Sequence, residues 1–144
     1  MSGKRRVLII EDDPQLLLLM RVNIEEAGFE TSLAADGTTG LRRIEAESPD
    51  AVVLDLALPG IDGWSVLAEL DRRERSPAVI VCSAKATSED RGRAYGWGAS
   101  AFIEKPFSVD ELVKTIGEAI EQALPRAGAN LAAAPPLLAD PEPA

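Results

Sequence analysis

Short apolar runs alternate along this chain with stretches that have helical spacing. Five such runs are present, each bounded by turn or charged residues. Alternation of this kind is typical of βαβ units, in which a helix connects two parallel strands. The pattern therefore predicts the α/β fold class, with a doubly wound, five-stranded parallel sheet and five helices.

The positions of these runs give the expected elements. We predict strands over residues 5–10, 30–33, 51–54, 78–82 and 101–103. We predict helices over residues 14–27, 37–46, 64–72, 88–95 and 108–124. The helix over 88–95 carries Gly92 where alanine would favour a helix by about 1 kcal/mol, so we expect this helix to be short or mobile.

Capping signals mark the ends of several predicted helices. Asp13 precedes a proline and is a suitable N-cap, while Gly28 suits a left-handed helix end. Asp36 can cap the second helix, and Ser108 with Glu111 forms a capping-box sequence before the last helix. These residues support three of the predicted helix starts and one helix end.

After position 124 the composition changes to prolines among many alanines. Prolines at this density prevent a stable helix. We therefore expect one domain over residues 1–124, followed by a disordered tail or interdomain linker over residues 125–144. A chain of 144 residues with 46% hydrophobic residues is long enough to bury one sizeable core.

The composition excludes several kinds of site and partner. The chain has no histidine, so it has no imidazole base, no histidine metal ligand and no histidine phosphoacceptor. A net charge of −9 argues against direct nucleic-acid binding, and no segment approaches the apolar length of a membrane span. The single cysteine, Cys82, lies in an apolar run and fits a reducing compartment. We expect a cytoplasmic protein whose partners are other proteins.

Polar side chains follow four of the five predicted strands. In a doubly wound parallel sheet, functional groups gather beyond the carboxyl ends of the strands. The residues at those ends are Glu11, Asp12, Asp55, Ser83 and Lys105. Three clustered carboxylates repel one another unless a cation is present, and oxygen ligands select a hard ion such as Mg²⁺.

The same residues indicate a reaction. Mg²⁺ held by carboxylates usually awaits phosphate oxygens, and a lysine ammonium and a serine hydroxyl suit those oxygens as well. Because no histidine is present to act as a general base, the group left to react is a carboxylate nucleophile. Phosphoryl transfer asks mainly for positioning and charge neutralisation, which this set of residues can supply.

Four segments of the chain resemble the receiver domain of bacterial two-component response regulators. They are residues 9–14 (IIEDDP), 53–63 (VLDLALPGIDG), 82–85 (CSAK) and 102–107 (FIEKPF). The segments occur in the family's order and at family-like spacing, and the resemblance covers about residues 4–124. It implies a flavodoxin-like receiver fold with strand order 2-1-3-4-5.

The resemblance implies a role for each matching residue. Asp55 would be the phosphoacceptor, Ser83 would bind a phosphoryl oxygen and move towards it, and Lys105 would pair with the phosphoryl group. The implied Mg²⁺ ligands are Glu11, Asp12, Asp55 and the backbone carbonyl of Ala57. Pro106 would follow a cis peptide that fixes where Lys105 points.

Phe102 stands at the family's aromatic switch position. The resemblance implies that its ring moves inward when Ser83 moves, and that the fourth helix, fifth strand and fifth helix form the face that signals. Phe102 has no hydroxyl, so a hydrogen-bonded output state of the ring is not expected. From the residues alone, Phe102 is equally well interpreted as a simple core aromatic.

The expected function is that of a receiver which accepts a phosphoryl group from a sensor histidine kinase or phosphotransfer protein and signals, as a stand-alone domain, by conformational change. It would not be an enzyme beyond self-phosphorylation from small acyl phosphates and slow self-dephosphorylation. One alternative is the receiver half of a larger transcription factor or cyclase, and another is an interaction module independent of phosphorylation. An aspartate-nucleophile phosphatase typically has a second acid two residues after the nucleophile, where this chain has Ala57.

Trp97 and the two leucines at positions 17 and 18 each have two possible interpretations. Trp97 is either an additional packing element or an exposed partner contact. Leu17 and Leu18 fall on the face of the first helix that the apolar positions 16, 20, 24 and 27 leave towards solvent. These two leucines would receive a kinase or phosphotransfer domain, or they are surface leucines present by chance.

Overall fold

A computed structural model of the chain describes residues 3–123, so the predicted tail over 125–144 and the end of the last predicted helix lie outside the described residues. The elements in chain order are β1 (Arg6–Ile10), α1 (Pro14–Glu26), β2 (Glu30–Ala34), α2 (Gly37–Glu47), β3 (Ala51–Asp55), α3 (Gly63–Asp71), β4 (Ala78–Ser83), α4 (Ser88–Gly96), β5 (Ala101–Glu104) and α5 (Val109–Ala123). Every predicted boundary that falls in the described part agrees with these bounds to within one residue. None of the described helices has both the length and the apolar character needed to cross a membrane.

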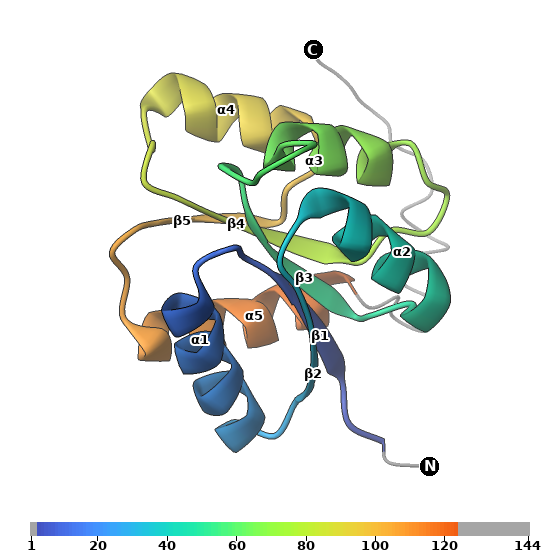
Figure 1. Cartoon of the computed structure of the whole chain (residues 1–144), viewed down its shortest axis with the longest axis vertical. Helices are drawn as coiled ribbons and strands as arrows, with labels where there is room; N and C mark the ends of the chain where they lie inside the picture. The colour runs from blue at the N-terminus through green and yellow to red at the C-terminus, as the bar shows by residue number, and fades with distance from the viewer. Residues whose placement is uncertain (1–2, 124–144) are drawn as a thin grey trace.

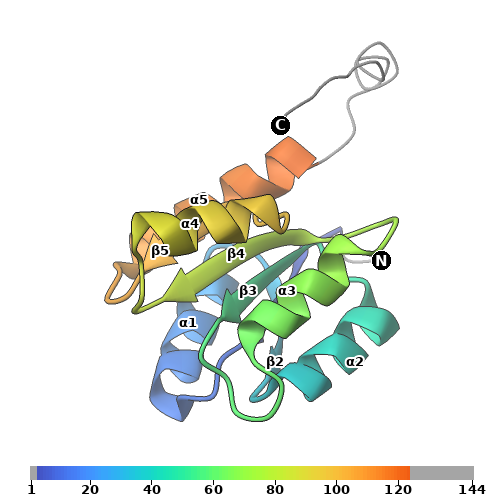
Figure 2. The same cartoon turned by 90° about the horizontal axis from the view of Figure 1, so that it is seen from above.

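The strands form one parallel sheet in the order β2-β1-β3-β4-β5, which confirms the predicted fold. Asp55 at the end of β3 pairs in register with Cys82 of β4, and Ser83 of β4 pairs with Glu104 of β5. Figure 2 shows β3 and β4 running in the same direction, so that the chain leaves both strands at one edge of the sheet. Residues that end these strands are therefore brought to a common edge.

Helices cover both faces of the sheet (Figure 1). Side chains alternate between the two faces along each strand. Val53 of β3 lies in one apolar cluster with Ile24 of α1 and Ile116 of α5. The next residue, Leu54, lies in the other cluster with Leu67 of α3. The sheet is thus buried on both sides, as its continuous apolar strands require.

The predicted capping residues occupy the expected positions. The side chains of Asp13, Asp36 and Ser108 each accept a hydrogen bond from a backbone N–H two or three residues later, at 3.0, 2.8 and 3.0 Å. Gly28 has a φ angle of 103°, a conformation that glycine adopts without strain. Helix α4 spans nine residues and its buried residue is Ala94, so the prediction of a short helix is confirmed. The mobility of this helix stays a prediction.

The two faces of α1 differ from the prediction at two residues, Leu17 and Ala27. Leu18 is 57% exposed, as expected. The prediction for Leu17 is wrong, because this side chain is half-buried and packs against the cluster that contains Met20 and Ile24. Leu17 lies three residues before Met20, and residues with this spacing share one face of a helix. Ala27, expected on the buried face, is exposed because the helix ends just before it.

Candidate functional site

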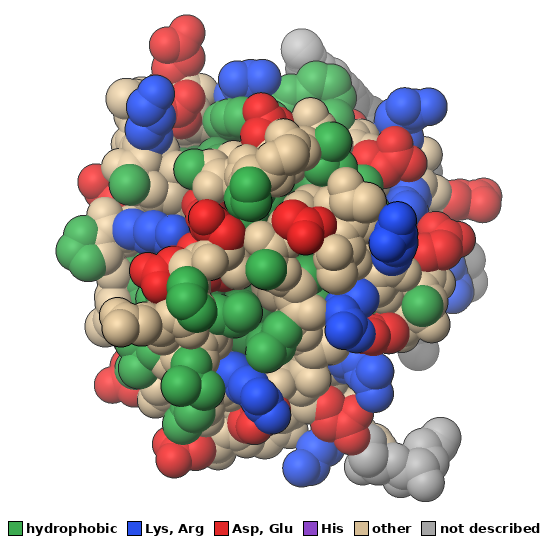
Figure 3. Space-filling model, in the orientation of Figure 1, with side chains coloured by type: hydrophobic (Ala, Val, Ile, Leu, Met, Phe, Trp, Pro, Cys, Tyr) green, Lys and Arg blue, Asp and Glu red, His purple; other side chains and the backbone are tan. Residues whose placement is uncertain are grey.

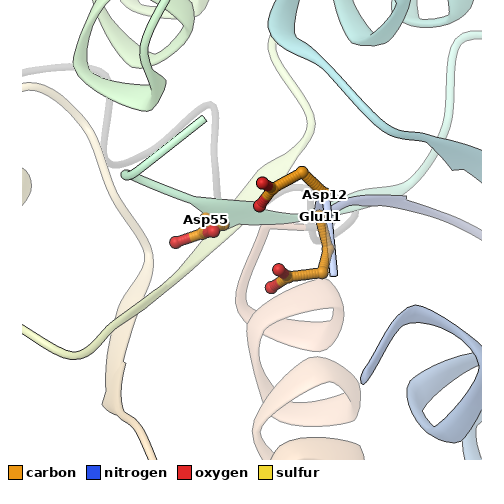
Figure 4. Close-up of side chains that lie close together, drawn as sticks. All are labelled: Glu11, Asp12 and Asp55. Carbon is orange, nitrogen blue, oxygen red and sulfur yellow. The ribbon is translucent and has the colours of Figure 1, made fainter. Parts of the chain in front are cut away.

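Two neighbouring strands bring three carboxylates together. Asp55 is the last residue of β3, while Glu11 and Asp12 directly follow β1. One carboxylate oxygen from each residue lies within 4.8 Å of the others, and Figure 4 shows the three side chains gathered at the strand ends. The structure thus places side by side the three acids that the sequence analysis selected.

The inner part of this cluster is shielded from water. Among residues 3–123, the buried polar or charged residues are Glu11, Asp55 and Ser83, at 2%, 5% and 5% exposure. Asp12 and Ala57 are exposed at the outer side. A charged carboxylate that is buried without a partner is strongly unfavourable. The acids therefore depend on a nearby positive charge.

Lys105 supplies one positive charge. Its Nζ donates a hydrogen bond to Glu11 Oε1 at 2.9 Å and lies 3.5 Å from Asp55 Oδ2. Its backbone N–H donates to the carbonyl oxygen of Ser83 at 2.9 Å, which continues the pairing of β4 with β5. The peptide between Lys105 and Pro106 is cis. The ammonium is thus held against the two buried acids.

Burial and neighbouring groups together set the pKa values of Glu11 and Lys105. Burial raises the pKa of Glu11 above its ordinary value, although hydrogen bonds from Lys105 Nζ and from the Asp13 N–H oppose this effect. For Lys105, burial lowers the pKa, but the hydrogen bond to Glu11 and the charge of Asp55 outweigh burial and leave the pKa raised. The lysine therefore stays cationic at neutral pH.

Backbone N–H groups fix the other two buried side chains. The Ala57 N–H donates to Asp55 Oδ1 at 3.2 Å, and the Lys85 N–H donates to Ser83 Oγ at 3.1 Å. Each donor lies two residues after its acceptor, an arrangement that Asp and Ser side chains adopt in turns. Because Ser83 Oγ accepts this bond, its own proton can be donated to a group that binds beside Asp55.

The donor set fits a hard divalent cation. All three side chains offer oxygen, and the ligands of an octahedral Mg²⁺ lie about 3.0 Å apart where they are neighbours and about 4.2 Å apart where they are opposite. One oxygen each of Glu11, Asp12 and Asp55 lies within 4.8 Å of the others, so the three side chains need only a small inward adjustment to reach one ion. Three carboxylates and Lys105 leave two negative charges, which one divalent cation would neutralise. This acidic cluster is therefore able to hold a metal ion.

Comparison with known families identifies the domain that carries these residues. The sequence model of the response regulator receiver domain matches residues 7–117. The chain belongs to the response regulator receiver family. The match extends from β1 into α5 and so includes the whole acidic cluster of this receiver domain.

Relatives and solved structures agree with this assignment. The transcriptional activator protein IrlR of Burkholderia pseudomallei is 40% identical over 111 residues, which are 77% of this chain and 48% of that protein. The transcriptional regulatory protein KdpE of Mycobacterium tuberculosis is 37% identical over 116 residues, 81% of this chain and 51% of that protein. The chain thus spans about half the length of the curated relatives it matches. The receiver domain of the Francisella response regulator 1452 superposes with a TM-score of 0.80 at 29% identity, covering 84% of this chain and 100% of that one.

The aromatic residues of this receiver domain lie in different environments. The ring of Phe102 is 7% exposed and already belongs to the apolar cluster between the sheet and helices α2 to α4. Its burial fits the interpretation as a core aromatic, and a movement of the ring upon phosphorylation stays a prediction. Trp97 is 41% exposed at the end of α4, and both interpretations of this residue stay predictions.

Two residues that bear on the site were missed by the sequence analysis. Gly63 begins α3, and a Cβ there would lie 2.5 Å from the Cα of Leu56 and would overlap the carbonyl oxygen of Asp55. A glycine at the start of a helix just after the predicted site is a signal that could have found it. Arg91 contacts β5 from α4 and has no comparable signal in the sequence.

Proposed function

We propose that this receiver domain accepts a phosphoryl group on Asp55 from a sensor histidine kinase or phosphotransfer protein. Mg²⁺ would be held by Glu11, Asp12, Asp55 and the backbone carbonyl of Ala57. The observation that carries the proposal is the packing of three carboxylates within 4.8 Å of one another beside Lys105 Nζ. Like charges repel in a partly buried site, so such a cluster favours a role that uses them.

The nucleophile in this proposal is a carboxylate oxygen of Asp55, which the Ala57 N–H orients. This oxygen attacks the phosphorus of the donor, and the new P–O bond forms as the P–N bond of a phosphohistidine breaks. The imidazole leaves with the electron pair; with a small acyl phosphate donor, a carboxylate leaves instead. Lys105 and Ser83 would donate hydrogen bonds to the phosphoryl oxygens. Bound Mg²⁺ would supply the remaining positive charge.

The proposed chemistry is confined to the protein's own carboxylate. We expect self-phosphorylation from acyl phosphates and slow self-dephosphorylation rather than turnover of a separate substrate. A phosphatase with an aspartate nucleophile needs a second acid as proton donor, and the position two residues after Asp55 is Ala57. The same domain would act as a signalling phosphoacceptor without that acid.

Phosphorylation would act by shifting a two-state equilibrium. A phosphoryl group on Asp55 would draw Ser83 towards it and favour one position of Phe102, which changes the face built from α4, β5 and α5. That face would bind a downstream protein rather than nucleic acid or membrane, which the net charge of −9 supports, and the protein would act in the cytoplasm.

The extent of the natural protein separates two forms of this proposal. The relatives are named as transcriptional regulators and are about twice as long as the matched segment, which favours a receiver that forms the input half of a transcription factor over a stand-alone regulator. A cyclase output or a phosphorylation-independent interaction module are further alternatives. A natural reading frame that continues past Ala144 would favour the input-half form.

An apolar face on α1 is suited to receive the phosphoryl donor. Leu18, Leu19 and Val22 are 57%, 49% and 46% exposed, and Figure 3 shows hydrophobic side chains gathered over α1 next to acidic ones. Helix α1 starts directly after the acidic cluster. A helix of the donor protein that docked on this face would therefore bring the donor's phosphohistidine close to Asp55. Leu18→Ser should slow transfer from a kinase that phosphorylates the wild type. Tyr95→Ser, which changes an exposed residue of α4, should leave that transfer unchanged.

Acetyl phosphate and Mg²⁺ provide the direct test. We expect mass spectrometry to find one phosphoryl group, located on Asp55. The modification should disappear with a chelator and in Asp55→Ala. A wild-type protein that gains no phosphoryl group from acetyl phosphate or from any histidine kinase would contradict the proposal. An acid-stable phosphate on Ser83 would contradict it as well.

A further inference from the structure

Arg91 of α4 contacts the switch region at three points. Its guanidinium carbon lies 5.0 Å from the centroid of the Phe102 ring. Its Nε donates a hydrogen bond to the carbonyl oxygen of Ala86 at 3.3 Å. Its Nη2 donates to Glu104 Oε1 at 3.5 Å. This side chain takes no part in the proposed phosphoryl transfer.

These contacts join two segments that flank the site. Ala86 lies in the loop that begins after Ser83, whereas Phe102 and Glu104 belong to β5. A cation over an aromatic ring is attracted to the face of that ring. The planar guanidinium can lie over the ring while its N–H groups donate to acceptors around it, which a lysine ammonium cannot do in the same way. Arg91 is thus able to connect the loop with the strand.

Arg91 also lies on the solvent side of the ring. The Phe102 ring is 7% exposed and packs inward against the apolar cluster, whereas the Arg91 side chain is 40% exposed. A ring that left the cluster towards solvent would have to displace the guanidinium and lose its contact with it. We propose that Arg91 is a positioning residue that holds Phe102 inward and links the ring to the loop after Ser83.

The consequence for signalling rests on the proposed function. When a phosphoryl group on Asp55 draws Ser83 and its loop, the Ala86 carbonyl moves with the loop and changes where Arg91 can sit. The movement thereby reaches Phe102 and the exposed Glu104 on the outer face of β5. A cation over an aromatic ring at an exposed site corresponds to about a two- to fivefold change in an equilibrium. Loss of Arg91 should reduce the ratio of inward to outward ring by that factor.

Fluorine NMR can follow the ring directly, because the chain contains three phenylalanines. The full chain is labelled with 4-fluorophenylalanine, and Phe102→Leu identifies the signal of interest. Spectra are recorded without Mg²⁺ and without a phosphoryl donor. In Arg91→Ala we expect the Phe102 signal to move and to become more sensitive to exchange of H₂O for D₂O. The signals of Phe29 and Phe107 should stay in place.

Matched variants separate the ring contact from general effects on α4. The guanidinium carbon of Arg93 lies 4.0 Å from the centroid of the Trp64 ring, so Arg93→Ala removes a similar contact from the same helix. This control should leave the Phe102 signal unchanged. Arg91→Lys keeps the charge without the planar group and should restore part of the wild-type shift. Alanine is a strong helix former, so α4 is retained in both alanine variants.

Two results would overturn the inference. One is a Phe102 signal in Arg91→Ala that coincides with the wild type; the other is an equal movement in Arg93→Ala. The rate at which acetyl phosphate labels Asp55 is measured on the same proteins, and in Arg91→Ala it should fall, by up to about the two- to fivefold change in the ring equilibrium. An unchanged rate beside a moved ring would refute the link to the loop. A wild-type protein that is never labelled would refute the proposed function and leave the ring measurement standing.

Discussion

A single methyl group at Gly63 should disturb both the fold and the site. Gly63 is the first residue of α3, and its N–H donates to the carbonyl oxygen of Leu56 at 2.9 Å. A Cβ at this position would lie 2.5 Å from the Cα of Leu56 and would overlap the carbonyl oxygen of Asp55, whereas real Cβ atoms essentially never come closer than 3.0 Å. Gly63 does not have a left-handed φ angle. Alanine is therefore disfavoured there by the close backbone contacts and not by the backbone conformation.

The size of the effect follows from what must move. Both obstructing groups are backbone atoms at the end of β3, so the strand end and α3 have to separate by about half an ångström or more. Overpacking typically destabilises a protein by about 1–3 kcal/mol. We expect about 3 kcal/mol for Gly63→Ala, because backbone cannot rotate away as a side chain can. With a urea m-value of about 1–3 kcal/mol per molar, the unfolding midpoint should fall by about 1–3 M. A misplacement of about 1 Å can slow a reaction by about 100-fold, so labelling of Asp55 should slow by up to that factor.

Urea unfolding and the rate of Asp55 labelling by acetyl phosphate test this reasoning. Gly40→Ala is the matched control, because its Cβ would also lie 2.5 Å from its nearest neighbour, the Cδ1 atom of Ile10. That atom ends a flexible side chain, so we expect a loss of about 1 kcal/mol and normal labelling. Equal midpoints for the two variants would refute the argument that rigid backbone contact sets the effect. Labelling of Gly63→Ala at the wild-type rate would refute the argument that Gly63 positions Asp55.

Further predictions concern three single side chains, Asp13, Cys82 and Lys105. Asp13→Ala should lose about 1 kcal/mol of stability, measured by urea unfolding, because the N-cap of α1 is removed. Labelling of Asp55 by acetyl phosphate should persist in this variant, because the backbone N–H of residue 13 still donates to Glu11 Oε2. Cys82 should not react with a thiol reagent at pH 8 until the protein unfolds, because burial raises its pKa from 9.0 to about 12; rapid stoichiometric reaction of the native protein would contradict this. The folded state keeps this thiol protonated, so its contribution to stability is complete below pH 9.0 and is lost as the pH rises towards about 12. The difference between the urea midpoints of the wild type and Cys82→Ala, measured across this pH range, tests the loss. Lys105→Met should increase the gain in melting temperature caused by Mg²⁺, because the carboxylates lose their ammonium partner; an equal gain in both proteins would argue against Mg²⁺ at this cluster.

The strands could be predicted from the sequence because of their burial. Every residue of Ala51–Asp55 and of Ala78–Ser83 is buried, so an apolar side chain is favoured at each position until the strand ends. The first polar residue then marks the end of the strand. The sheet edge to which parallel strands deliver their ends follows from topology alone, and this is why the acids and Lys105 could be grouped from their positions in the sequence.

Contacts made by side chains across the fold could not be predicted in the same way. Leu17 was placed on the wrong face because apolar spacing gives the middle of a buried stripe but not its width. The lack of space for a Cβ at Gly63 depends on how closely the start of α3 approaches the end of β3, and no local sequence pattern gives that distance. The position of Arg91 over Phe102 depends on the distance between α4 and β5 in the same way.

The candidate site needs rigid elements, whereas the proposed signalling face needs elements that can move. The two lie on parts of the fold that bury different numbers of residues. Asp55 ends a strand that is buried throughout, whereas α4 is anchored by one buried residue, Ala94. Helix α3 has the same nine-residue length but buries four residues. Local opening requires less free energy where fewer apolar contacts are lost, so backbone amides of α4 should exchange with deuterium faster than those of α3. Gly92→Ala should slow that exchange, because a Cβ at Gly92 meets no atom within 4 Å and alanine favours a helix by about 1 kcal/mol. Exchange in α4 as slow as in α3 would show that α4 is held as firmly as α3, and it would contradict the proposal that phosphorylation acts by moving α4.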